Sequence, residues 1–124
     1  MVLVDTSVWV YHFREGSNGL EKLLNDGDVI CHPLIIGEIA CGNLNKRSEI
    51  LSMLQSLPSA IEAEHEEVLQ FIERHHLMGK GLGYIDAHLL TSSMLTTAPI
   101  WTLDKKLIEV SEKLGISVGK KFFR

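Results

Sequence analysis

Four acidic residues stand alone in apolar stretches of this 124-residue chain, and they restrict the folds that it can adopt. Three of them are the only charged residue of a stretch: Asp5 in residues 1–13, Glu38 in residues 29–45, and Asp86 in residues 81–103. The fourth, Asp104, directly follows the last of these stretches. Carboxylates in segments bound for a core are unfavourable unless something compensates their charge. Because these stretches contain no Lys or Arg, the pattern indicates that the missing partner is a metal ion.

Length and composition predict a single domain over residues 1–124 with one hydrophobic core. An apolar fraction of 45% and a charged fraction of 23% are ordinary for a soluble globular protein. No continuous apolar span of about 20 residues is present, so no membrane segment is expected. No basic region precedes the apolar start, so we expect no secretory peptide and a cytoplasmic protein.

The net charge of −4 argues against a general nucleic-acid binder, for which a basic balance is expected. Net charge is not decisive here, because a bound cation would neutralise several of the acids. Basic residues also cluster locally, at Lys46-Arg47, at Lys105-Lys106, and at Lys120-Lys121 with Arg124. Such clusters permit contact with phosphate without requiring it.

The hydrophobic pattern alternates between short apolar runs and amphipathic stretches. The runs predict strands at residues 1–5, 28–31, 99–103 and 116–118, with a minor strand at 59–62. The stretches predict helices at residues 8–13, 20–24, 33–42, 46–57, 64–78, 84–95 and 104–114. Strands that alternate with helices predict an α/β fold with a parallel sheet.

Each acid has a structural interpretation as well as a functional one. Asp5 and Asp104 lie where a strand meets a helix, and Asp86 lies in a first helical turn, so all three could stabilise helix N-termini. Glu38 has no such role, because it lies in the middle of a helix that is otherwise apolar on every side. We therefore expect that helix to be buried and Glu38 to point into a site lined by protein.

Taken together, the four acids predict a metal site. Ligands of open parallel sheets bind beyond the carboxyl ends of the strands, where Asp5 and Asp104 are expected. Four carboxylates ~6 Å apart form six repelling pairs, each unfavourable by about 2–3 kcal/mol at an effective dielectric of 20. The sum is comparable with the whole stability of a domain, about 5–15 kcal/mol. Such a cluster requires a cation or raised pKa values, and oxygen ligands alone select Mg²⁺ or Mn²⁺.

Other reactive or aromatic side chains are expected to be structural. Cys31 and Cys41 are set in apolar surroundings, which predicts two buried reduced thiols. A zinc site that uses both with His32 is the alternative, although the spacing matches no common zinc motif. The aromatic residues expected in the core are Trp9, Tyr11, Tyr84 and Trp101.

Four short motifs, in order along the whole chain, carry a resemblance to a known family. They are Val4-Asp5-Thr6-Ser7-Val8, Gly37-Glu38-Ile39, Gly83-Tyr84-Ile85-Asp86-Ala87 and Trp101-Thr102-Leu103-Asp104. Together they resemble the PIN-domain family and, among its members, the VapC-type ribonuclease toxins of toxin–antitoxin pairs. One position departs from the family, because relatives often have an acid where this chain has Lys106.

The resemblance implies a three-layer α/β/α domain with a central, mostly parallel sheet. It implies that Asp5, Glu38, Asp86 and Asp104 are catalytic, and that Asp5, Asp86 and Asp104 hold Mg²⁺, for which Mn²⁺ is a plausible substitute. By the same resemblance, Thr6, Ser7 and Thr102 would hold the carboxylates or the metal-bound water in place. The partners implied are an RNA substrate, a homodimer mate, and a VapB-like antitoxin that covers the acidic groove.

The function expected from this resemblance is that of a Mg²⁺-dependent endoribonuclease toxin, in which metal-activated water hydrolyses RNA phosphodiesters. One alternative is a metal-dependent phosphatase or phosphotransferase with Asp5 as nucleophile. Such enzymes usually have a second Asp two residues later, where this chain has Ser7. The other alternative is a non-catalytic, metal-dependent binding module.

Overall fold

The centre of the molecule is a small parallel sheet, seen in a computed structural model that describes residues 1–119. The basic cluster at residues 120–124 lies outside the described residues. The strands are β1 (Val2–Val4), β2 (Val29–Ile30) and β3 (Ile100–Trp101), in the order β2-β1-β3. Leu3 pairs with Ile30 on one side and with Ile100 on the other. The fully buried β1 is therefore the central strand.

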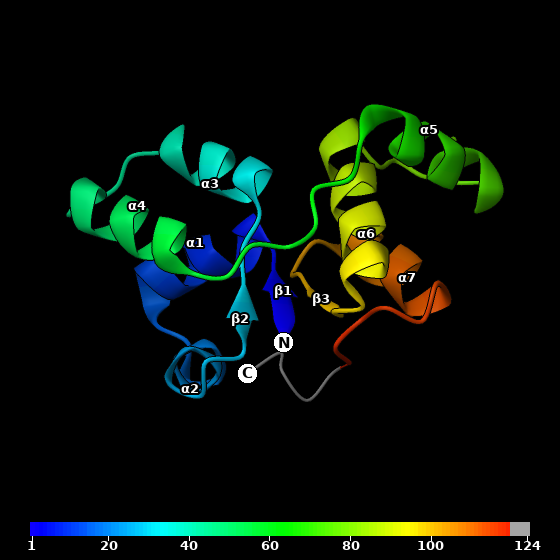
Figure 1. The fold of residues 1–124 in the computed structure, drawn as a ribbon. Coiled ribbons are helices and arrows are strands. Elements are labelled where there is room, and N and C mark those ends of the chain that lie inside the picture. The colour runs from blue at the N-terminus through cyan, green and yellow to red at the C-terminus, as the bar shows by residue number, and fades with distance from the viewer. Residues whose placement is uncertain (120–124) are drawn as a thin grey trace.

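Helices cover both sides of this sheet (Figure 1). They are α1 (Thr6–Glu15), α2 (Asn18–Asn25), α3 (Pro33–Ala40), α4 (Arg47–Ser56), α5 (His65–Arg74), α6 (Tyr84–Thr96) and α7 (Lys105–Lys113). Helices α1, α3 and α4 gather on one side of the strands, and α5, α6 and α7 on the other. This arrangement confirms the α/β/α fold with a parallel sheet. No helix within residues 1–119 has the length and apolar character needed to cross a membrane.

Local chemistry sets where several helices begin and end. The Ser17 hydroxyl accepts the backbone N–H of Leu20 and starts α2. His32 starts α3 in the same way through its ring, and Pro33 occupies the first helical position. Helix α1 ends at Gly16, whose φ of +79° is a conformation that glycine adopts without strain.

The hydrophobic core lies between the sheet and the two helical layers. Its largest fully buried side chains are Trp9, Leu3, Leu20, Ile35, Leu54, Leu89, Leu90, Ile100 and Leu107. Helix α3 packs mainly against α1 and α4, and α6 packs mainly against α5. The two helical groups therefore meet chiefly through the sheet.

The predicted strands at residues 59–62 and 116–118 are reduced to single bridges. Ser59 pairs with Cys31, and Ser117 pairs with Ile100. Pro58 precedes the first segment and Gly115, with φ of +72°, precedes the second. The chain thus arrives at each sheet edge from a turn and pairs there over one residue. The sheet of regular strands is correspondingly narrower than the sequence pattern suggested.

Candidate active site

The carboxyl ends of the parallel strands lie at one edge of the sheet, and two predicted site segments emerge there. Asp5 directly follows β1, and Thr102 directly follows β3. The two segments are joined by a backbone hydrogen bond of 2.9 Å from the Asp5 N–H to the carbonyl of Trp101. Residues almost a hundred positions apart are thereby adjacent, at the edge where open α/β sheets bind ligands.

Asp5 is held by hydroxyl groups rather than used as a helix cap. Its side chain is buried, and Oδ2 accepts hydrogen bonds of 2.8 Å from both Ser7 Oγ and Thr102 Oγ1. It makes no side-chain hydrogen bond to the N-terminus of α1, although it is the residue that precedes that helix. The capping interpretation is therefore wrong for Asp5. A buried carboxylate that only neutral hydroxyls hold still carries a charge that a cation can neutralise.

Ser7 and Thr102 form a hydroxyl pair that ties the ends of β1 and β3 together. Each donates its proton to Asp5, and each accepts a backbone N–H from the β3–α7 connection. Leu103 N–H donates to Ser7 Oγ over 2.9 Å, and Asp104 N–H donates to Thr102 Oγ1 over 3.1 Å. With both hydroxyl protons committed, Asp5 is fixed as an acceptor in a single orientation.

Glu38 is linked through Thr6 to the segment that follows Asp5. The Thr6 hydroxyl donates a 2.7 Å hydrogen bond to Glu38 Oε1, across the contact between α1 and α3. The carboxylate is exposed, however, so the prediction that α3 is buried all round is wrong. Ile35 and Ile39 face the core, whereas Gly37 and Glu38 lie on an open face. Ile36 is partly buried against the core and Leu34 is half-buried, so only part of this apolar helix is covered.

Asp86 is half-buried in the first turn of α6, and the charges of two of the other acids affect its pKa. Burial is the main cause that raises its pKa above the ordinary carboxyl value. A 3.3 Å hydrogen bond from the Gly83 N–H to Oδ2 acts in the opposite direction. The negative charges of Asp5 and Asp104 raise the pKa further. Asp86 therefore lies near enough to Asp5 and Asp104 for their charges to act on it.

Asp104 has the capping role that its position suggested. Its Oδ1 accepts the backbone N–H groups of Lys106 and Leu107 over 3.0 and 3.1 Å and so starts α7. The side chain is exposed, and its charge still reaches Asp86. A carboxylate has two oxygens, so a capping Asp can present the second one to a ligand. Structural and ligand-binding roles are compatible at this residue.

The donor set fits a hard divalent cation by its chemistry, since it consists of carboxylate and hydroxyl oxygens. The side chains do not form a closed coordination sphere as they stand. Within residues 1–119, no three His, Cys, Asp or Glu side chains lie close enough together to hold an ion. This finding also removes support for the zinc alternative with Cys31, His32 and Cys41. Ion binding at the acids would therefore require rearrangement of these side chains.

Two other expectations are only half correct. Cys31 is buried, but Cys41, which follows the last residue of α3, is exposed. Trp9 and Trp101 are buried, whereas Tyr11 and Tyr84 are 49% and 44% exposed. The Tyr84 hydroxyl lies 2.9 Å from His65 Nδ1, beside the glycine-containing segment that leads to Asp86.

A buried polar contact that the sequence did not predict links α3 to α6. His32 and Ser92 are both fully buried, and His32 Nε2 lies 3.1 Å from Ser92 Oγ. The other ring nitrogen, Nδ1, accepts the backbone N–H of Leu34. Burial, followed by the neighbouring His88, lowers the pKa of His32 to about 4, while Glu62 acts weakly in the opposite direction. The ring is therefore neutral at pH 7.

Acid should destabilise the protein partly through His32. Its pKa of about 4 in the fold lies below the ordinary 6.5, so between these values the unfolded chain binds the proton more readily. The stability contribution is complete above pH 6.5 and is lost as the pH falls toward 4, a change of about 3 kcal/mol. Urea unfolding of wild type and His32→Asn at a series of pH values measures this difference. Parallel pH profiles for the two proteins would contradict the assignment, because Asn does not titrate.

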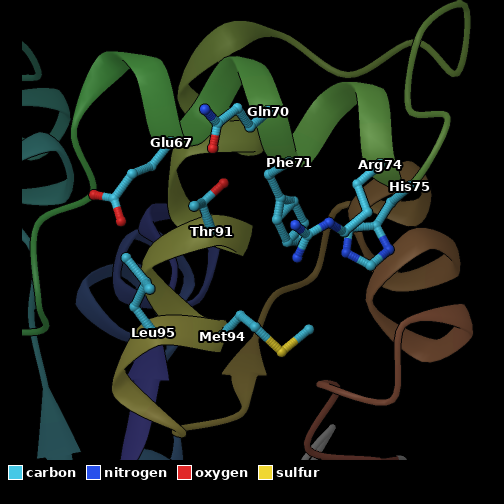
Figure 2. Close-up of a pocket in the computed structure, with 8 residues that line it drawn as sticks. All are labelled: Glu67, Gln70, Phe71, Arg74, His75, Thr91, Met94 and Leu95. Atoms are coloured by element: carbon cyan, nitrogen blue, oxygen red, sulfur yellow. The ribbon is translucent and has the colours of Figure 1, made fainter.

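A separate cavity of about 170 Å³ lies between α5 and α6 (Figure 2). It is lined by Glu67, Gln70, Phe71, Arg74, His75, Thr91, Met94 and Leu95. Figure 2 shows Phe71, Arg74 and His75 side by side at one end of the cavity and Glu67 at the other. Because none of the four predicted acids lines it, we do not place the chemistry there.

Comparison with known proteins gives concordant results. Residues 2–113 match the PIN domain family. The chain is 39% identical over 122 residues to Ribonuclease VapC32 from two strains of Mycobacterium tuberculosis, with 98% of each chain covered. The similarity therefore extends over nearly the whole length of both proteins.

Solved structures share the fold at lower sequence identity. PAE2754 from Pyrobaculum aerophilum superposes with a TM-score of 0.60 and 18% identity over 91% of this chain and 85% of that chain. FitAB bound to an IR36 DNA fragment superposes with a TM-score of 0.63 and 15% identity over 90% and 91%. FitAcB from Neisseria gonorrhoeae gives 0.63 and 18% over 90% and 94%. At these identities the likeness bears on the fold alone.

Proposed function

The chain belongs to the PIN-domain family, and from this premise we propose that it is a metal-dependent endoribonuclease that acts as the toxin of a toxin–antitoxin pair. The observation that carries the proposal is the grouping of acids at the carboxyl edge of the sheet. Asp5 is buried there under two hydroxyls, and its charge and that of Asp104 both raise the pKa of Asp86. The 39% identity to Ribonuclease VapC32 supports an RNA substrate.

The residues proposed to hold the metal are Asp5, Asp86 and Asp104, with Mg²⁺ as the expected ion and Mn²⁺ as a substitute. When bound, such an ion supplies an activated water and offsets the charge that develops on the phosphate. Asp5 can take part without losing its hydroxyl contacts, because Ser7 and Thr102 both bind Oδ2 and leave Oδ1 available. Asp104 likewise caps α7 with Oδ1 alone.

Glu38 is the proposed acceptor of the proton from the attacking water. Its carboxylate is exposed, so substrate can reach it, and Thr6 fixes the orientation of Oε1. Thr6 itself directly follows Asp5, so Glu38 is hydrogen-bonded to the residue next to the proposed metal ligand. Because water attacks rather than the ribose 2′-hydroxyl, the products should carry 5′-phosphate and 3′-hydroxyl ends.

The partners in this proposal follow from the relatives. A small antitoxin would silence the enzyme by covering the acidic groove, as the resemblance to VapC-type toxins implies. The neighbours FitAB and FitAcB are of the same fold. Homodimerisation remains a prediction that sedimentation of the purified chain would test.

The direct test is RNA cleavage by the purified chain. We expect Mg²⁺-dependent cleavage of transfer RNA, ribosomal RNA or messenger RNA, loss of cleavage in EDTA, and recovery on addition of Mn²⁺. Mapping of the product ends should find 5′-phosphates. Cyclic phosphate ends, or cleavage that persists in EDTA, would contradict the mechanism. Metal binding without cleavage of any RNA class would favour the non-catalytic binding module instead.

A further inference from the structure

Two of the four site acids lie on helices that do not pack closely on each other. Helix α3, which carries Glu38, packs against α1 and α4, whereas α6, which carries Asp86, packs against α5. Figure 1 shows the two helices on opposite sides of the strands. The sheet between them therefore sets much of their relative position, and a buried polar contact adds a direct link between the two helices.

That contact is the buried pair of His32 and Ser92. Nδ1 of His32 accepts the Leu34 N–H, so the proton of the neutral ring is on Nε2, which donates to Ser92 Oγ over 3.1 Å. Ser92 Oγ also accepts the N–H of Ala63 over 3.1 Å, from the segment that crosses between the two helical groups. One hydroxyl thus holds the start of α3, the middle of α6 and the crossing segment.

We propose that the His32–Ser92 pair is a positioning joint that fixes the helix of Glu38 relative to the helix of Asp86. The inference rests on the proposed function, because the distance between the two helices would set the width of the proposed acidic groove. His32 stands six residues before Glu38, and Ser92 stands six residues after Asp86. A shift at the joint therefore moves both carboxylates relative to Asp5.

The chemistry of the joint favours a single geometry. Both side chains are fully buried, so a displaced His32 or Ser92 would leave N–H groups unpaired in an apolar interior. The His88 ring packs edge-on against His32, with 5.0 Å between ring centroids, and limits its rotation. Hydrophobic contacts alone would tolerate small sliding movements that a directional hydrogen bond does not.

The test breaks the joint from each side and compares a matched control. Ser92→Ala removes the acceptor, and His32→Asn keeps a good helix cap but is too short to reach Ser92. Thr91→Val is the control, because the neighbouring Thr91 hydroxyl is also buried and, among residues 1–119, its hydrogen bond stays within α6, to the carbonyl of Ala87. The fold of each variant is checked by circular dichroism. If Ser92→Ala does not fold, His32→Asn alone is compared with Thr91→Val.

The first measurement is the distance between α3 and α6 by pulsed electron paramagnetic resonance. One spin label goes on the native Cys41, which is exposed at the end of α3, and the other on Met94→Cys, at an exposed position of α6. Cys31 is buried, and burial raises the pKa of its thiol, so it reacts slowly with the label. We expect Ser92→Ala and His32→Asn to shift or broaden the distance distribution, and Thr91→Val to match the unmodified background.

The second measurement is the affinity for Mn²⁺ by calorimetry, together with RNA cleavage. Each joint variant should bind Mn²⁺ about 10- to 100-fold more weakly. The double variant should lose no more than either single one, because both changes remove the same contact. High Mn²⁺ should restore cleavage in the joint variants. Because ion binding also stabilises a folded protein, cleavage is compared at a temperature well below the unfolding midpoint of each metal-free variant.

The outcomes separate the two hypotheses. Unchanged distance distributions in both joint variants overturn the joint, whether or not the chain cleaves RNA. Changed distributions with unchanged Mn²⁺ affinity and cleavage overturn its role in the groove. A wild type that neither binds Mn²⁺ nor cleaves RNA overturns the proposed function, and the distance comparison then still decides whether the joint positions the helices.

Discussion

Replacement of Asp5 by Asn should lower RNA cleavage by at least about 1,000-fold while leaving the fold intact. Asp5 lies at the centre of the hydrogen-bond network that joins β1 and β3, and it is the buried member of the acidic group. Asn keeps an oxygen that can accept from Ser7 and Thr102, so the network can survive. What Asn lacks is the negative charge that a cation requires from this position. Initial rates of RNA cleavage at saturating Mg²⁺ measure the effect.

A matched control for this change exists on the neighbouring strand. Asp28 precedes β2, which runs parallel to β1, so it lies at the opposite edge of the sheet from Asp5. Asp28→Asn makes the same chemical change and should leave cleavage within a few-fold of wild type. The thermal midpoint of Asp5→Asn should equal or exceed that of wild type, because the change removes repulsion between carboxylates. Substantial residual cleavage by Asp5→Asn would rule out the site.

The general position of the acidic site could be predicted because its chemistry is visible along the chain. Asp5 and Asp104 each follow an apolar run that is too short for a helix, which marks both as strand ends. Parallel strands then bring them to one edge without further information. Asp5 could be distinguished from the many other acids of the chain because it is the only charged residue in residues 1–13. The same isolation at Asp104 coincides with helix capping, and the structure gives Asp104 that capping role.

The exposure of Glu38 could not be predicted, because it depends on which faces of α3 find partners. The sequence of α3 is apolar nearly all round, a pattern typical of a buried helix. In the fold, only the face with Ile35 and Ile39 is fully covered. The open face at Gly37 and Glu38 follows from the placement of α1 and α4 on the other sides. Such placement is a property of tertiary packing, not of the local pattern.

The joint between His32 and Ser92 was beyond sequence reasoning for a related reason. The two residues are 60 positions apart, and a Ser within an apolar helix gives no indication of its partner. The available signal was the His-Pro pair at residues 32 and 33, since a residue before a first-turn proline is a natural helix cap. That signal predicts the bond from Nδ1 to the backbone. It says nothing of the second ring nitrogen, which makes the long-range contact.

Replacement of Asp86 by Asn should have opposite effects on activity and on stability. Cleavage should fall by at least about 100-fold, because the proposed metal site loses a ligand. The free energy of unfolding at pH 7 without metal should rise. Burial, the largest cause, and the charges of Asp5 and Asp104 raise the pKa of Asp86, so its ionised form is less favourable in the fold than in the unfolded chain. Asn keeps an acceptor for the Gly83 N–H and carries no charge.

The sign of the stability change can be checked against pH and metal. The advantage of Asp86→Asn should be present at neutral pH and should vanish as the pH falls below the ordinary carboxyl pKa, where Asp86 is protonated in both states. Adding Mg²⁺ should narrow or reverse the difference, because ion binding stabilises only the wild type. Urea unfolding of the two proteins at pH 7 and at pH 3, which is below the ordinary carboxyl pKa of about 3.9, supplies the pH comparison, and the pH 7 measurement is repeated with Mg²⁺. A variant that is less stable than wild type at pH 7 without metal would mean that Asp86 serves the fold rather than a site that its charge destabilises.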